Sequence, residues 1–170
     1  MAVLPPERVL DAVAGLARPA TPGLRWTARE QWHVTLRFLG AVDDAGPVVE
    51  ALQGVAAGET AAPVEASLGP AVGRFGNRVL HVPVSGLDAL AARVVEASAG
   101  CGRPPEGRGF AGHLTLARVA HDARVDLGPL AGGRVSERWT VAAVCLVESH
   151  LGPAGPRYEV LERFAVSPPS

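Results

Sequence analysis

Hydrophobic positions along the chain follow two different spacings. In the segment that begins at Glu7, the apolar residues Val9, Leu10, Val13 and Leu16 recur every three or four positions, which places them on one face of a helix. Elsewhere, apolar residues come in short runs bounded by glycine, proline or asparagine, as in β-strands. The two spacings predict helices over residues 7–17, 44–57 and 87–99, and strands over residues 32–40, 63–68, 78–84, 110–119, 141–149 and 158–166.

The order of these segments indicates the fold class. Strands and helices are mixed along the chain, and no segment between them resembles a domain linker. A chain of 170 residues, 48% hydrophobic and 19% charged, is long and apolar enough to bury a sizeable core. We therefore predict one α+β domain over residues 1–170, and we expect it to be a monomer.

A short motif occurs twice, each time on a predicted strand. His33-Val34-Thr35-Leu36 is echoed by His-Leu-Thr-Leu at residues 113–116. Because side chains alternate along a strand, the histidine and the threonine of each copy share one face, and the two apolar residues face the core. One such motif is weak evidence of function, since a half-exposed histidine beside a threonine is common. Two copies on two apolar strands indicate a shared site.

The residue types of this pair suit phosphodiester chemistry. One neutral and one protonated imidazole can act as base and acid near neutral pH, because the ordinary pKa of histidine is about 6.5. The hydroxyls of Thr35 and Thr115 can donate hydrogen bonds to phosphoryl oxygens. Arg118 follows the second motif closely and can add a guanidinium fork.

Other side chains are weaker candidates for substrate contact. On a regular strand Arg37 would share the face of His33 and Thr35 and could meet a phosphate. Phe38 and Tyr158 could stack on a terminal base, with Phe75 and Phe110 weighed in the same way. We interpret the remaining aromatic and imidazole side chains as packing, structural or surface residues: Trp26, Trp32, Trp139, His81, His121 and His150.

Composition and motif searches exclude several other classes. The net charge of −1 provides no global field for nucleic acid, so any RNA contact must be local; all 16 basic residues are arginine. The two cysteines form no metal-binding pattern, and no carboxylate stands at ligand spacing from His33 or His113, so we expect no metal. No Walker A motif, signal peptide or membrane-spanning segment is evident, which favours a cytoplasmic protein that needs no cofactor.

The two motifs and the residues around them resemble those of a known family. H-V-T-L-R-F-L-G and H-L-T-L-A-R are similar to the paired H-x-T-x motifs of the 2H phosphoesterases, and in particular of their LigT-like branch, the RNA 2′,3′-cyclic phosphodiesterases or 2′-5′ RNA ligases. The similarity covers nearly the whole chain, from AVLPPERVLDAV to the closing SHLGPAGPRYEVLERFAV. Two departures are local: only Met1–Leu4 stand where the family has a fuller, edge strand, and Gly112 replaces the proline often found before the second histidine.

The resemblance implies a bilobal α+β fold, with two pseudo-symmetric lobes of antiparallel sheet around a central cleft and helices outside. It implies metal-independent opening of an RNA-terminal 2′,3′-cyclic phosphate to a 2′-phosphate, with reverse 2′-5′ ligation as a further activity and tRNA fragments among the candidate RNAs. His33, Thr35, His113 and Thr115 correspond to the catalytic set, and Arg118 to the phosphate-binding arginine. We assign His113 as the base and His33 as the acid.

Two alternatives stay open from the sequence. The same pocket could belong to a non-catalytic module that binds nucleotides or RNA ends, although a pure binder does not need both an acid and a base. An enzyme could instead act on a small ester such as ADP-ribose 1″,2″-cyclic phosphate, or on a 2′-5′ oligoadenylate. The physiological RNA does not follow from the residues.

Overall fold

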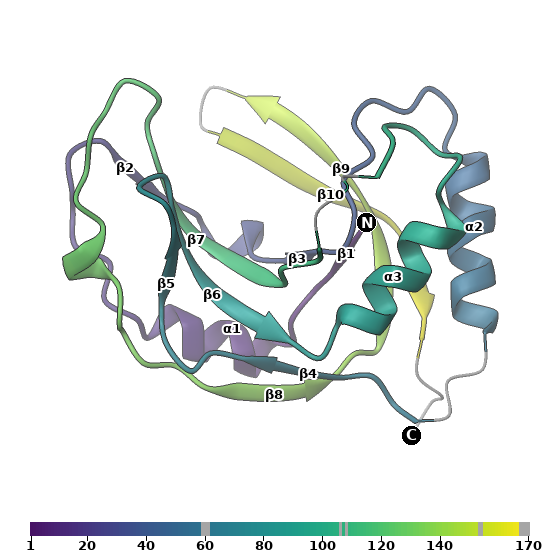
Figure 1. Cartoon of the computed structure of the whole chain (residues 1–170), viewed down its shortest axis with the longest axis horizontal. Helices are drawn as coiled ribbons and strands as arrows, with labels where there is room; N and C mark the ends of the chain where they lie inside the picture. Colours follow the sequence, from purple (N-terminus) through teal and green to yellow (C-terminus); the bar gives the residue numbers. More distant parts are fainter. Residues whose placement is uncertain (59–61, 106, 108, 153–154, 167–170) are drawn as a thin grey trace.

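The computed structural model describes residues 1–58, 62–105, 107, 109–152 and 155–166. It contains three α-helices, α1 (Glu7–Ala14), α2 (Gly46–Ala57) and α3 (Asp88–Ala97). The strands are β1 (Ala2–Val3), β2 (Leu24–Trp26), β3 (Val34–Thr35), β4 (Glu65–Leu68), β5 (Gly73–Phe75), β6 (Val79–Ser85), β7 (His113–Val119), β8 (Glu137–Thr140), β9 (Ala143–Gly152) and β10 (Gly155–Ala165). Two 3₁₀ turns, η1 (Arg29–Gln31) and η2 (Gly128–Leu130), complete the elements (Figure 1).

The strands form one connected, antiparallel sheet. Its order is β10-β9-β1-β3-β7-β6-β4-β8, with β2 also paired to β7 and β5 to β6. The β10-β9-β1-β3 half joins the other half where β3 meets β7, and there Val34 lies opposite Leu114. Both side chains are fully buried. The predicted α+β class is therefore confirmed, and the two motif strands are neighbours in the sheet.

The short first strand lies inside the sheet and not at its edge. β1 pairs with β3 on one side, where Ala2 lies opposite Thr35, and with β9 on the other, where Ala2 lies opposite Cys145. Ala2 and Val3 are almost fully buried. The expectation of an edge strand is thus wrong, because β1 is paired on both sides, with β3 and with β9.

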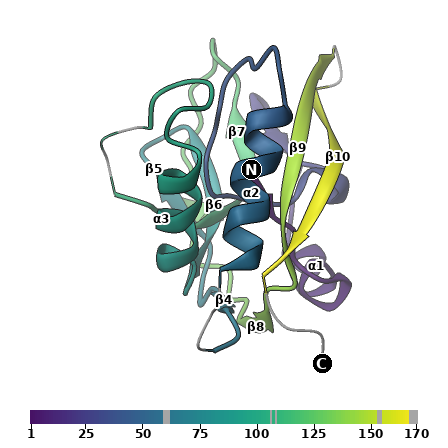
Figure 2. The same ribbon diagram turned by 90° about the vertical axis from the view of Figure 1, so that its right-hand side faces the viewer.

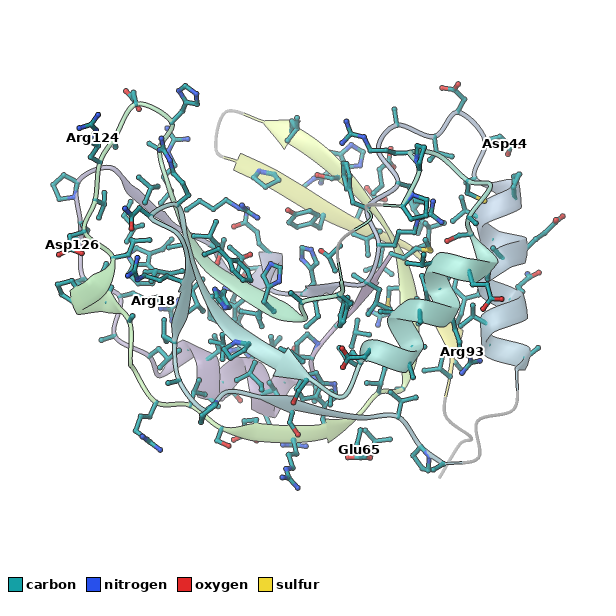
Figure 3. The ribbon with its side chains drawn as sticks, viewed as in Figure 1. Arg18, Asp44, Glu65, Arg93, Arg124 and Asp126 are labelled. Carbon is teal, nitrogen blue, oxygen red and sulfur yellow. The ribbon has the colours of Figure 1, made fainter. Side chains whose placement is uncertain are left out.

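The helices cover the sheet with the apolar faces that their spacing predicts. α1 buries Val9 and Val13 and packs beside β8, whereas α2 and α3 lie side by side at the other end of the molecule (Figures 1 and 2). Arg93 of α3 reaches across to α2 and donates a hydrogen bond to the carbonyl of Val55 (Figure 3). Among the helices of the described residues, none combines the length and apolar character that a membrane span requires.

The strand predictions need two corrections. The predicted strand over residues 32–40 is regular only at β3, because the chain after Thr35 leaves the ladder and turns Arg37 into the interior. The sequence patterns also missed β2, β5 and β8, which have three or four residues each and are held by their neighbours in the sheet. So short a segment shows too few alternations to identify a strand.

Candidate active site

His33 and His113 lie on one face of the sheet, next to the join between its halves. Val34 and Leu114 face each other across β3 and β7 and point into the core. Since side chains alternate along a strand, the residues before and after each of them lie on the opposite face. We call this the site face. It brings together His33, Thr35, His113 and Thr115, as the repeated motif predicts.

Each imidazole makes the same contact with its own backbone. Nδ1 of His33 lies 2.8 Å from the carbonyl oxygen of Gln31, and Nδ1 of His113 lies 2.7 Å from that of Ala111. A carbonyl only accepts, so each Nδ1 carries a hydrogen and donates it. The other nitrogen, Nε2, is then the atom that takes up or releases a proton in each ring. Two rings oriented alike in this way are suited to acid–base work.

A β-bulge in β7 sets the direction of Arg118. Leu80 of β6 lies opposite Ala117, but the next residue, His81, lies opposite Thr115, so Leu116 is an extra residue on β7. On a regular strand Arg118 would lie on the face opposite to Thr115. The extra residue reverses the alternation, because a bulge re-aims the side chains that follow it. Arg118 is exposed on the site face, while Leu116 and Ala117 are both buried.

Thr27 stabilises this bulge from the chain beside β7. Its amide donates to the carbonyl of Leu116 at 2.8 Å, and its hydroxyl lies 2.8 and 2.9 Å from the carbonyls of Thr115 and Leu116. The same hydroxyl accepts a hydrogen bond from Nε1 of buried Trp32. Trp32 is thus a packing residue, as predicted, and it also fixes the hydroxyl that holds the bulge.

Two aromatic side chains flank the histidines from different strands. Tyr158 of β10 stands edge-on to His33, with ring centroids 4.6 Å apart. Phe75 of β5 stands edge-on to His113 at 4.8 Å. Tyr158, which the sequence singled out, therefore lies at the site, and Phe75 occupies the equivalent place beside the second histidine.

A third histidine completes this side of the site. His81 is buried, stacks on Phe75 with centroids 3.9 Å apart, and stands edge-on to His113 at 5.6 Å. A Cβ at Gly73 would lie 3.3 Å from the His81 ring, so the absence of a side chain on β5 makes room for it. The sequence analysis placed His81 among structural or surface histidines. Alternation along β6 could have indicated its face, but its place opposite Thr115 depends on the register between two strands, which leaves no sequence signal that we recognise.

Burial and positive neighbours act together on His33. Loss of hydration lowers the pKa of His33 below its ordinary value, and the charges of the N-terminal amino group, His113 and Arg118 lower it further, against the hydrogen bond to Gln31. The effect of Arg118 on His33 agrees with the bulge geometry, which places both on the site face. In the free protein the neutral form of His33 is therefore favoured.

Arg37 and Phe38 do not take the places that were predicted. The Arg37 side chain is buried and donates hydrogen bonds to Ser98 and to the carbonyls of Val95, Cys101 and Arg103. It is a structural residue and cannot meet a substrate. The reason is that β3 ends at Thr35, so the alternation on which the prediction rested stops there. Phe38 is 62% exposed and, among the described residues, has no ring contact with either histidine.

No cluster of metal ligands was found in the part of the chain that the structure describes. Within these ranges, no three histidine, cysteine, aspartate or glutamate side chains gather closely enough to hold an ion. In those ranges, His33, His113 and His81 form no such group with a carboxylate.

Comparison with known proteins assigns the fold to a family. The sequence profile of the 2′-5′ RNA ligase superfamily matches residues 5–153. An RNA 2′,3′-cyclic phosphodiesterase of Geobacillus stearothermophilus is 31% identical over 121 residues, which cover 66% of this chain and 38% of that protein. The match thus spans well under half the length of that relative.

Solved structures agree with this assignment. The chain resembles TT0787 of Thermus thermophilus with a TM-score of 0.78 and 30% identity, over 97% of this chain and 95% of that one. It resembles Escherichia coli LigT, crystallised with 3′-AMP, with a TM-score of 0.70 and 24% identity, over 98% and 96% of the two chains. The second likeness concerns the fold alone. This chain belongs to the 2′-5′ RNA ligase superfamily and is related to its LigT-like RNA 2′,3′-cyclic phosphodiesterases.

Proposed function

We propose that the protein hydrolyses the 2′,3′-cyclic phosphate at an RNA end to a 2′-phosphate, by acid–base catalysis between His33 and His113. The observation that carries this proposal is the matched pair of imidazoles on one sheet face, each with Nδ1 held by a carbonyl and Nε2 left for proton transfer. Family membership and the related phosphodiesterase support the substrate class.

The reaction is a single displacement at phosphorus. A water oxygen attacks the phosphorus as its proton passes to Nε2 of His113, and the bond between phosphorus and the 3′-oxygen breaks. The 3′-oxygen takes a proton from Nε2 of His33, which leaves a 3′-hydroxyl and a 2′-phosphate. Each proton transfer contributes about 10² to 10⁴ in rate. An RNA 5′-hydroxyl in place of water gives a 2′-5′ linkage by the same steps.

The other residues of the site face bind and orient the phosphate. Thr35 and Thr115 donate hydrogen bonds to its non-bridging oxygens, and Arg118 adds a charge-assisted fork. Tyr158 lies against His33 and can also stack on the terminal base, since its ring is only half-buried. Arg37 and Phe38 have no part in this proposal.

To act as the acid, His33 must be protonated when the substrate is bound. Burial and three positive neighbours lower the pKa of His33 in the free protein. A bound phosphate brings negative charge beside the same ring and opposes those neighbours, which raises the pKa towards the range where His33 holds its proton. We therefore expect His33 to gain its proton in the complex with the substrate.

A turnover assay tests the reaction class. A short RNA that ends in a 2′,3′-cyclic phosphate is incubated with the protein in EDTA, with and without an RNA that bears a 5′-hydroxyl, and the product is identified by phosphorus NMR. We expect a 2′-phosphate in both. An unchanged RNA with folded protein would contradict the proposal and favour a smaller cyclic ester or a binding module.

Single-histidine variants test the mechanism. His33→Ala and His113→Ala should each lower kcat by at least about 10² while the circular dichroism spectrum stays the same, because each removes one proton transfer. His121→Ala is the matched control, since His121 is exposed and, among the described residues, has no ring contact with either catalytic histidine. Near wild-type turnover in His113→Ala would rule the mechanism out.

Replacing the 3′-oxygen of the cyclic phosphate by sulfur distinguishes the acid from the base. A thiolate leaves without a proton, so this substrate should restore much of the rate of His33→Ala and none of that of His113→Ala. If the sulfur substrate restores the rate of His113→Ala and not that of His33→Ala, then His113 is the acid and His33 is the base.

A further inference from the structure

Arg25 lies directly opposite Arg118 in the sheet. In the pairing of β2 with β7, Leu24 faces Val119, Arg25 faces Arg118 and Trp26 faces Ala117. Side chains of directly opposed residues project from the same face of an antiparallel pair. Leu24 and Val119 are buried in the core, so Arg25 and Arg118 both project from the site face. The bulge that turns Arg118 towards the histidines thus also sets it beside a second arginine.

The two guanidinium groups have no anionic partner among the residues that the structure describes. Both side chains are exposed, and neither forms a salt bridge or side-chain hydrogen bond with another described residue. Like charges directly opposite each other on neighbouring strands destabilise a sheet. Arg8, Arg29 and Arg157, by contrast, each have a carboxylate partner. An unneutralised pair beside a phosphate site is suited to binding an anion.

We propose that Arg25 and Arg118 form a subsite for a second phosphate of the substrate, the one attached to the 5′-oxygen of the terminal nucleoside. This proposal rests on the proposed function, since it assumes that the cyclic phosphate lies between the histidines. The bulge in β7 places Arg118 on the same face as Thr115, so Arg118 is directed towards that phosphate. β2 and β3 pair with the same edge of β7, because β6 occupies the other edge, and β2 lies towards the Val119 end of β7. Arg25 therefore lies further along β7 from His33, where it reaches the next phosphate group along the substrate.

Arginine is suited to this role because its fork can donate two hydrogen bonds to one phosphate group. The subsite makes the protein selective for RNA ends over nucleoside cyclic phosphates, which carry no 5′-phosphate. It depends on no base contact and therefore adds affinity without sequence preference.

Three substrates and a matched pair of variants test the subsite. The substrates are adenosine 2′,3′-cyclic phosphate, its 5′-phosphorylated form, and a diadenosine that ends in a cyclic phosphate. The second and third distinguish a terminal phosphate from an internucleotide diester. We expect wild-type kcat/KM to be about tenfold to a hundredfold higher for a substrate with the second phosphate, as a charge-assisted hydrogen bond contributes. In Arg25→Gln this preference should fall to about one.

Arg138→Gln is the control. Arg138 is also an exposed strand arginine, but it lies on β8, which β6 and β4 separate from β7, so its loss should leave the preference as in the wild type. If Arg25→Gln retains the preference, the proposal is wrong. It is equally wrong if Arg25→Gln lowers kcat/KM for all three substrates by the same factor, because Arg25 then acts only by supporting the fold or Arg118.

A binding measurement keeps this test independent of turnover. Calorimetry compares adenosine 2′-phosphate with adenosine 2′,5′-bisphosphate as ligands of each protein. The wild type should bind the bisphosphate about ten times more tightly, and Arg25→Gln should bind both alike. If the protein shows this gain in affinity but turns over no cyclic phosphate, the subsite is supported and the proposed function is contradicted. Equal binding of both ligands by the wild type would overturn the subsite.

Discussion

At the scale of single residues, three histidines of similar position differ in what surrounds them. His33 and His113 each give their Nδ1 hydrogen to a backbone carbonyl, whereas Nδ1 of His81 is buried and has no hydrogen-bond partner among the described residues. Burial, and then the charge of His113, lower the pKa of His81 below its ordinary value. The neutral form of His81 is therefore favoured in the folded protein. Its ring stacks on Phe75 and packs against His113.

The lowered pKa of His81 predicts how stability depends on pH. In the unfolded chain its pKa is about 6.5, so below that pH the unfolded state binds the proton more readily than the folded state. The free energy of unfolding should therefore decrease as pH falls from about 6.5 towards the lowered pKa. Urea denaturation from mildly alkaline to mildly acidic pH should show this decrease, and His81→Gln should make it smaller.

The exposed residue His121 provides the control for this measurement. His121→Gln should leave the pH dependence as it is in the wild type, because His121 is exposed and lies outside the cluster of His81, Phe75 and His113. An unchanged slope in His81→Gln would show that His81 does not contribute to it. Some slope remains in His81→Gln, because the pKa of His33 is lowered in the same direction.

At the scale of elements, the bulge in β7 decides which residues share the site. Leu116 is the extra residue, and Thr27 of the chain beside it satisfies its carbonyl. The bulge gives Arg118 the same face as Thr115, although their spacing along a regular ladder would separate them. His81 lies opposite Thr115 in the regular part of the ladder and shares that face. The bulge therefore brings the Arg118 guanidinium to the face that carries His81 and the proposed catalytic pair.

Removing the charge of Arg118 tests this geometry directly. Arg118 lowers the pKa of His33, so Arg118→Gln should raise it. The titration of the His33 ring can be followed by NMR, through its Cε1–H resonance. Arg138→Gln, which removes the same charge from β8, should cause no such shift. If both variants leave the pKa of His33 unchanged, Arg118 does not lie on the site face.

At the scale of the whole molecule, Arg37 joins segments that are far apart in the sequence. Its guanidinium binds carbonyls of Val95, Ser98, Cys101 and Arg103, at the end of α3 and in the segment after it. Its own carbonyl accepts a hydrogen bond from the N-terminal amino group of Met1. The chain after the first motif is thereby fixed to β1 and to the α3 end of the molecule.

Substitution of Arg37 should affect stability and not chemistry. Arg37→Gln removes the donor from one buried and three half-buried carbonyls, so we expect the free energy of unfolding to fall by about 2 to 4 kcal/mol. The kcat of the protein that stays folded should change little, because Arg37 points away from the site face. Urea denaturation and an assay at low temperature measure the two effects, with Arg138→Gln as the exposed control. A large loss of kcat without loss of stability would contradict this prediction and show that Arg37 contributes to the reaction.

The sequence by itself determined which residues are candidates for the chemistry of this protein. The repeated His-x-Thr pattern identifies both histidines and both threonines, because alternation along a strand is a local property that needs no partner strand. The apolar spacing likewise predicts all three helices and the longer strands. These features depend only on neighbours within a few residues, so they can be read before the fold is known.

Tertiary structure alone decided what surrounds that chemistry. The bulge at Leu116, the pairing of Arg25 with Arg118 and the stack of His81 on Phe75 all depend on the register between separate strands. Arg37 is the opposite case, a residue that the sequence placed in the site and the structure removed from it. Alternation from His33 and Thr35 predicted that it faces the site, but its side chain is buried and bonded to Ser98. Periodicity fixes the face of a side chain only while the ladder continues, and where a ladder ends or bulges is decided by the packing of the whole sheet.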